Sequence, residues 1–159
     1  MSLVEGRLKA LDITLPEVAA PAGVYVPAKR VDTMVYTSGQ LPFADGKLLH
    51  PGVLGADVTV EQGYEAARQC ALNALAALKS VIGDFDRIED IVKVTGFVAS
   101  APGFTEQPAV INGASEIIGE LFGKPAGDHA RSAVGVAALP LGSCVEVEIQ
   151  ARFRMSATR

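Results

Sequence analysis

Residues 144–153, CVEVEIQARF, alternate strictly between two kinds of side chain. One set is apolar and consists of Val145, Val147, Ile149, Ala151 and Phe153. The other set begins with a thiol and is otherwise polar: Cys144, Glu146, Glu148, Gln150 and Arg152. Successive residues of a strand point to opposite faces of a sheet, so the segment predicts a strand with its apolar face against helices. Its polar face is either a plain solvent-facing surface or the site of a carboxylate, Glu146, that acts as a general base on water.

The segment before it, residues 130–137, predicts a second strand, and Arg131 stands there among small residues. A guanidinium can hold a carboxylate through two parallel hydrogen bonds, and Ala133 and Gly135 would leave room for such a ligand. The alternative is a structural ion pair between Arg131 and one of the two glutamates. We expect Arg131 and Glu146 to come from neighbouring strands and to line one hollow where subunits meet.

The remaining segments complete an α/β (α+β) pattern. Apolar side chains recur every three or four positions in residues 59–82 and 107–122, which predicts two long helices, and a shorter helix is expected within residues 3–12. Further strands are predicted over residues 24–26, 33–38 and 91–99, with a hairpin turn at Asp45–Gly46. Long helices between strands indicate crossovers over one helix-covered sheet. We expect a single domain over residues 1–159, with a helical extension (1–21) and a core (22–155).

Composition excludes several classes of function. The net charge is −4 and no run of basic residues is present, which disfavours binding to nucleic acid. No apolar stretch approaches the roughly 20 residues of a membrane span, and no signal peptide is visible, so a cytoplasmic protein is expected. Two cysteines and two histidines without clustering predict no metal site, and no phosphate-binding glycine motif occurs. The mean hydropathy of +0.29 favours an oligomer with buried interfaces.

Three segments in the same order resemble the RidA/YjgF family of reactive-intermediate deaminases. They are TSGQLP (37–42), DIVKVTGFVAS (90–100) and ARSAVGVAALPLGSCVEVEIQA (130–151). The resemblance covers residues 22–155 and implies a chorismate-mutase-like fold, in which a mixed sheet has two long helices on one face. It also implies a homotrimer with clefts between subunits. Active members hydrolyse enamine and imine intermediates to a 2-keto acid and ammonia, without a cofactor or a metal.

The resemblance also assigns roles by position. It places the carboxylate-binding arginine at Arg131 and the water-positioning glutamate at Glu146, which together form the expected catalytic pair. The substrate-binding residues that it implies, besides Arg131, are Tyr25, Gly39, Asn112 and Ala133.

Some features depart from the family pattern and indicate a separate subgroup. Ala133 stands where many active members carry cysteine. The sequence GDHARS (127–132) leads into Arg131, where the segment common in the family contains proline. The roles of His129 and Cys144 stay open, and so does the natural substrate. A second hypothesis is a non-catalytic regulatory protein that binds small carboxylates or keto acids, for which Glu146 would not be needed. A ribonuclease, a third hypothesis, is disfavoured by the acidic composition.

Overall fold

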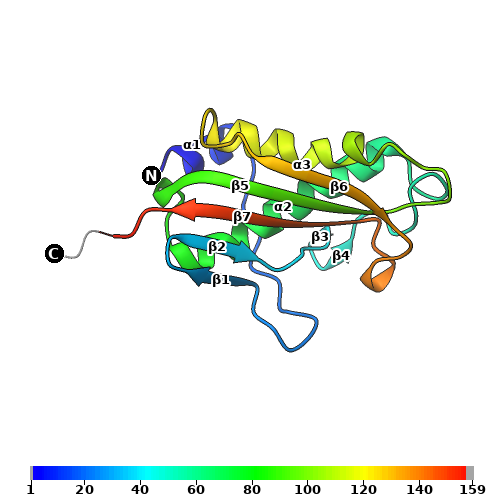
Figure 1. Cartoon of the computed structure of the whole chain (residues 1–159), viewed down its shortest axis with the longest axis horizontal. Helices are drawn as coiled ribbons and strands as arrows, with labels where there is room; N and C mark the ends of the chain where they lie inside the picture. The colour runs from blue at the N-terminus through cyan, green and yellow to red at the C-terminus, as the bar shows by residue number, and fades with distance from the viewer. Residues whose placement is uncertain (1, 157–159) are drawn as a thin grey trace.

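A five-stranded sheet with the strand order β1-β2-β7-β5-β6 organises the molecule (Figure 1). The structure is a computed structural model that describes residues 2–156. The strands of this sheet are β1 (Ala28–Val31), β2 (Met34–Thr37), β5 (Ile88–Ala99), β6 (Ala130–Val136) and β7 (Val145–Phe153). Only β5 and β6 run parallel, and all other pairs are antiparallel, so the sheet is mixed.

Two long helices, α2 (Val60–Ile82) and α3 (Gln107–Phe122), cover one face of the sheet, and no helix among the described residues covers the other face (Figure 1). Helix α2 begins with a capping box, in which Thr59 and Gln62 satisfy each other's backbone N–H groups, and it ends at Gly83. Helix α3 crosses from β5 to β6, as a parallel pair requires. The prediction of one sheet covered by two long helices is therefore confirmed.

Shorter elements lie at the margins. Helix α1 (Leu3–Ala10) begins with a capping box formed by Ser2 and Glu5. Strands β3 (Phe43–Ala44) and β4 (Lys47–Leu48) form the predicted hairpin around Asp45–Gly46, and single turns η1 (Phe85–Arg87) and η2 (Pro140–Gly142) precede β5 and β7. Among residues 2–156 no helix combines the length and apolar character needed to cross a membrane. The division into an extension and a core stays a prediction.

The core lies between the sheet and the helices, where the alternation of β7 places its apolar set. Every member of that set is fully buried: Val145, Val147, Ile149, Ala151 and Phe153. Residues Glu146, Glu148 and Gln150 lie half-buried on the opposite, uncovered face. The alternation in sequence therefore predicted the orientation of this strand correctly.

The strand predicted over residues 24–26 was wrong. These residues form an exposed bend, and the first strand begins at Ala28, directly after Pro27. Proline has no backbone N–H to donate to a neighbouring strand, so it marks the point where pairing begins. The β-branched Val24 and Val26 satisfied the sequence pattern but have no apolar partner surface, and Val24 is fully exposed.

Gly113 allows α2 and α3 to pack closely against each other. A Cβ atom at this position would lie 2.0 Å from the carbonyl oxygen of Tyr64, a backbone atom that cannot move aside alone. We expect Gly113→Ala to lower the free energy of unfolding by about 3 kcal/mol, because overpacking forces the helices apart. Gly119→Ala on the same helix meets open space and should be neutral or stabilise by ~0.5–1 kcal/mol. Urea unfolding at matched protein concentration measures both variants. Equal changes in their free energy of unfolding would contradict the prediction.

Candidate functional site

The Glu146 carboxylate lies directly against Gly39. After β2 the chain departs from β7 and returns at Gln40, which exchanges two backbone hydrogen bonds with Val147, at 2.8 and 3.1 Å. Between these points the Thr37 hydroxyl accepts the Ile149 N–H at 2.9 Å in place of a backbone carbonyl. A Cβ atom on Gly39 would lie 2.7 Å from Glu146 Oε1. Glycine at this position therefore makes the space that the carboxylate occupies.

The Glu146 carboxyl has a raised pKa. Its side chain is half-buried, and no hydrogen bond or ion pair to it occurs among residues 2–156. Burial raises the pKa of the Glu146 carboxyl, and the neighbouring negative charge of Glu148 raises it further. A carboxylate with a raised pKa takes a proton from water more readily than an exposed one does.

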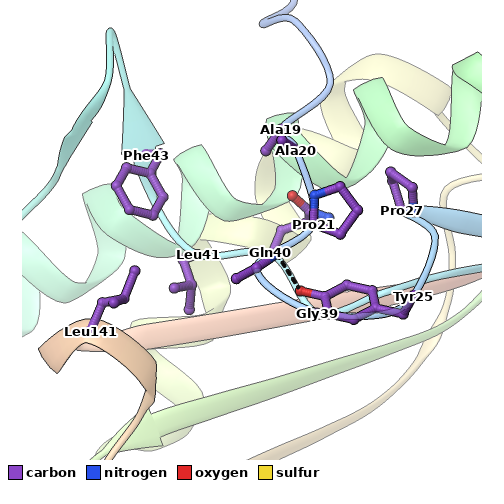
Figure 2. A pocket seen from close by; sticks show the side chains of 11 residues that line it. Ala19, Ala20, Pro21, Tyr25, Pro27, Gly39, Gln40, Leu41, Phe43 and Leu141 are labelled. Atoms are coloured by element: carbon purple, nitrogen blue, oxygen red, sulfur yellow. Dashed lines mark hydrogen bonds between the residues drawn. The ribbon is translucent and has the colours of Figure 1, made fainter.

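Tyr25 and Gly39 line a small cavity of about 70 Å³ (Figure 2), and Gly39 also lies against the Glu146 carboxylate. The Tyr25 hydroxyl accepts a hydrogen bond from the Ala22 N–H at 3.2 Å, which pins the bend of residues 22–25. The rest of the wall is mostly apolar and is formed by Ala19, Ala20, Pro21, Ala22, Pro27, Gln40, Leu41, Phe43 and Leu141. Three of the expected site residues, Tyr25, Gly39 and Glu146, therefore occupy one region of the molecule.

Arg131 lies on the edge strand β6, and its guanidinium reaches α3. Nη1 donates to Asn112 Oδ1 at 2.8 Å and to Ser115 Oγ at 3.2 Å, and Nη2 donates to the Pro108 carbonyl at 3.3 Å. Arg131 has no ion pair to a glutamate among the described residues, which removes the structural alternative considered from the sequence. Ala133 follows two residues later on the same face and packs against the core.

Within one chain Arg131 and Glu146 point to opposite faces of the sheet. On β5, Arg131 pairs with Val94 and Glu146 pairs with Phe97. Paired residues share a face, and residues three apart on a regular strand do not. Val94 is buried beneath the helices, so Arg131 lies on the helix side and Glu146 on the uncovered side. The expectation of neighbouring strands was wrong, because β5 lies between β6 and β7.

Cys144 also lies elsewhere than expected. The alternation placed it with Glu146, but β7 begins only at Val145, and Cys144 is buried in the core. Burial raises the pKa of its thiol to about 11, so the thiol stays protonated at neutral pH. No group of three or more potential metal ligands occurs among residues 2–156.

Ser115 was not among the site residues predicted from the sequence, and His129 had no predicted role. Ser115 follows Asn112 by three positions on α3, so both face Arg131, and this spacing is the signal that could have identified it. His129 stands two residues before Arg131 on the same chain segment, and its Nε2 lies 2.8 Å from Ser115 Oγ. The guanidinium therefore contacts Asn112, Pro108 and Ser115 directly, and His129 contacts Ser115.

Comparison with known proteins identifies the family of the chain. The family described as "YjgF/chorismate mutase-like, putative endoribonuclease" matches residues 5–153. The chain is 47% identical to protein TCP17 of Trypanosoma cruzi over 145 residues, covering 91% of each. It is 32% identical to the 2-iminobutanoate/2-iminopropanoate deaminase of Dermatophagoides farinae over 138 residues, covering 86% of this chain and 91% of the relative.

A crystal structure of a protein of unknown function from Agrobacterium tumefaciens has the same fold. It superposes with a TM-score of 0.88 at 44% identity, covering 96% of this chain and 93% of the other. The expected chorismate-mutase-like α+β fold is thereby confirmed.

Removing the charge at position 148 should lower the pKa of Glu146. In Glu148→Gln the repulsion between the two carboxylates is gone while the burial remains, so the pKa should fall toward, but not reach, the ordinary value. Glu120→Gln, a change on α3, is the matched control and should leave that pKa unchanged. Carbon-13 NMR titration with labelled glutamate, assigned with Glu146→Gln, measures both. An unchanged pKa in Glu148→Gln would show that the two carboxylates do not interact.

Proposed function

The chain belongs to the YjgF/RidA family, and from this premise we propose that it hydrolyses imines that carry a carboxylate, giving a 2-keto acid and ammonia. The observation that carries the proposal is the half-buried Glu146 carboxylate with its raised pKa, held against Gly39. The relative from Dermatophagoides farinae, whose name states an activity on 2-iminobutanoate and 2-iminopropanoate, supports the same substrate class.

In this proposal Arg131 binds the carboxylate of the substrate. A guanidinium carries five N–H donors, and the bonds to Asn112, Ser115 and Pro108 use three of them. The Nε–H and one N–H of Nη2 have no partner among residues 2–156, and two donors match the two oxygens of a carboxylate. Asn112 thus supports the arginine, while Tyr25, Gly39 and Ala133 border the substrate.

Glu146 then acts on water. It takes a proton from a water molecule whose oxygen attacks the imine carbon, which gives a tetrahedral carbinolamine. The protonated Glu146 returns this proton to the imine nitrogen, which gives the neutral carbinolamine. The hydroxyl proton of the carbinolamine then moves to the same nitrogen, through Glu146, as the C–N bond breaks, so that ammonia leaves and the C=O bond of the keto acid forms. A free imine is already electrophilic, so positioning and one base suffice, and the reaction requires no cofactor.

The site is shared between two copies of the chain, in a homotrimer with clefts between subunits. Arg131 and Glu146 lie on opposite faces of one sheet, so a substrate can touch both only if they come from different chains. The uncovered face around Glu146 supports such an interface. It exposes apolar side chains that include Tyr36 and Val134, at 41% and 42% of their surface.

Glu146→Gln should abolish ammonia release from 2-aminoacrylate generated in situ, because the amide cannot take a proton from water. The binding of 2-oxobutyrate should persist in this variant. Arg131→Ala should abolish that binding and leave the assembled mass unchanged. Ammonia assays, calorimetry and light scattering measure the three effects. Parent and Glu146→Gln proteins that both match the uncatalysed rate, while the keto acid still binds, would favour a regulatory carboxylate-binding protein instead.

Mixing the two inactive variants should restore activity. After co-refolding Arg131→Ala with Glu146→Gln at equal amounts, about a quarter of the shared sites should join an intact arginine to an intact glutamate. The control is each variant refolded alone, which should stay inactive. No recovery in mixed trimers would contradict a site shared between chains.

A further inference from the structure

We propose that Ser115 and His129 form a positioning pair that orients the guanidinium of Arg131 toward the carboxylate of the substrate. The inference rests on the proposed function for the identity of the ligand. The pair itself stands on contacts between α3, the turn before β6 and β6. Neither residue touches the substrate in this account, and both act through Arg131.

The hydrogen bonds fix the direction of the pair. His129 Nδ1 lies 2.8 Å from the Gly127 carbonyl oxygen, which can only accept, so Nδ1 carries the proton. The other ring nitrogen of a neutral imidazole is then an acceptor, and it receives the Ser115 hydroxyl proton across 2.8 Å. The lone pairs of Ser115 Oγ consequently face Arg131, which donates from Nη1 at 3.2 Å.

This arrangement decides which donors of Arg131 stay free. With Nη1 held by Ser115 and Asn112, and Nη2 held by Pro108, the guanidinium plane has a fixed orientation. The Nε–H and the second N–H of Nη2 lie along one edge of that plane, the edge that a carboxylate can approach with both oxygens. If Nη1 lost its fixed orientation, the guanidinium plane would rotate, and the edge formed by the Nε–H and Nη2 groups would no longer face the substrate carboxylate.

Ser115 is the partner best placed to hold that orientation. Asn112 is exposed, whereas Ser115 and His129 are half-buried. His129 connects Ser115 to the backbone at Gly127, which is buried against the end of α3. An arginine side chain loses considerable rotamer freedom when it binds a ligand, so fixing it beforehand strengthens binding.

Binding and turnover of the intact protein test the pair. Ser115→Ala and His129→Leu should each raise the Kd of 2-oxobutyrate and the KM for in situ 2-aminoacrylate by about tenfold, while kcat changes less than twofold. The double variant should lose little more than either single variant, because the two residues act as one unit. Ser80→Ala, a change at an exposed helix serine that is bonded to the carbonyl of Ala77, is the control and should bind as the parent does.

Conservative variants separate positioning from a purely structural role. Ser115→Thr keeps the hydroxyl, and His129→Gln offers an oxygen near the place of Nε2, so both should recover most of the affinity. Variants with parental Kd and KM would overturn the inference, whatever happens to their melting temperature. Losses in kcat and melting temperature at constant Kd would overturn it as well.

Failure of the proposed function gives a different result. A parent protein that neither binds 2-oxobutyrate nor releases ammonia would refute the function. The pair would then be judged by nitrogen-15 NMR of the guanidinium, in which rotation about the Arg131 Cζ–Nη1 bond should be faster in Ser115→Ala than in the parent. Equal rotation rates would overturn the pair independently of any ligand.

Discussion

The pleat of strand β5 constrains everything that this molecule can do with its arginine and its glutamate. Arg131 pairs with Val94 and Glu146 with Phe97, and these positions lie on opposite faces of a regular strand. Within a single chain the two side chains therefore leave the sheet on opposite sides. A reaction that uses both therefore makes assembly a condition of activity, because one copy contributes the cation and another contributes the base.

Different interactions set the properties of Arg131 and of Glu146. On the helix side, residues of α3 accept hydrogen bonds from three donors of Arg131, and two donors have no partner among residues 2–156, which supports the proposed binding of a carboxylate. On the uncovered side, burial and the charge of Glu148 make Glu146 a better base, while Gly39 leaves room for its carboxylate. Closure of an interface over this face would bury Glu146 further and raise its pKa more.

Much of the fold could be predicted from sequence because it depends on local periodicity. The caps of α2, the apolar stripe of α3 and the alternation of β7 each determine an element over a few residues. The strand order cannot be obtained in this way, since nothing local indicates that β5 inserts between β6 and β7. The same limit explains the displaced Cys144, where the strand had not yet begun, and the overlooked Ser115, whose role depends on the packing of α3 beside β6.

The most direct test of the central claim is a crystal structure of the assembled protein with 2-oxobutyrate bound. We expect the ligand carboxylate to contact the Nε and Nη2 atoms of Arg131 from one chain, while the Glu146 that faces the ketone carbon belongs to another. A ligand held by Arg131 and Glu146 of the same chain, or bound where no second chain approaches, would contradict it.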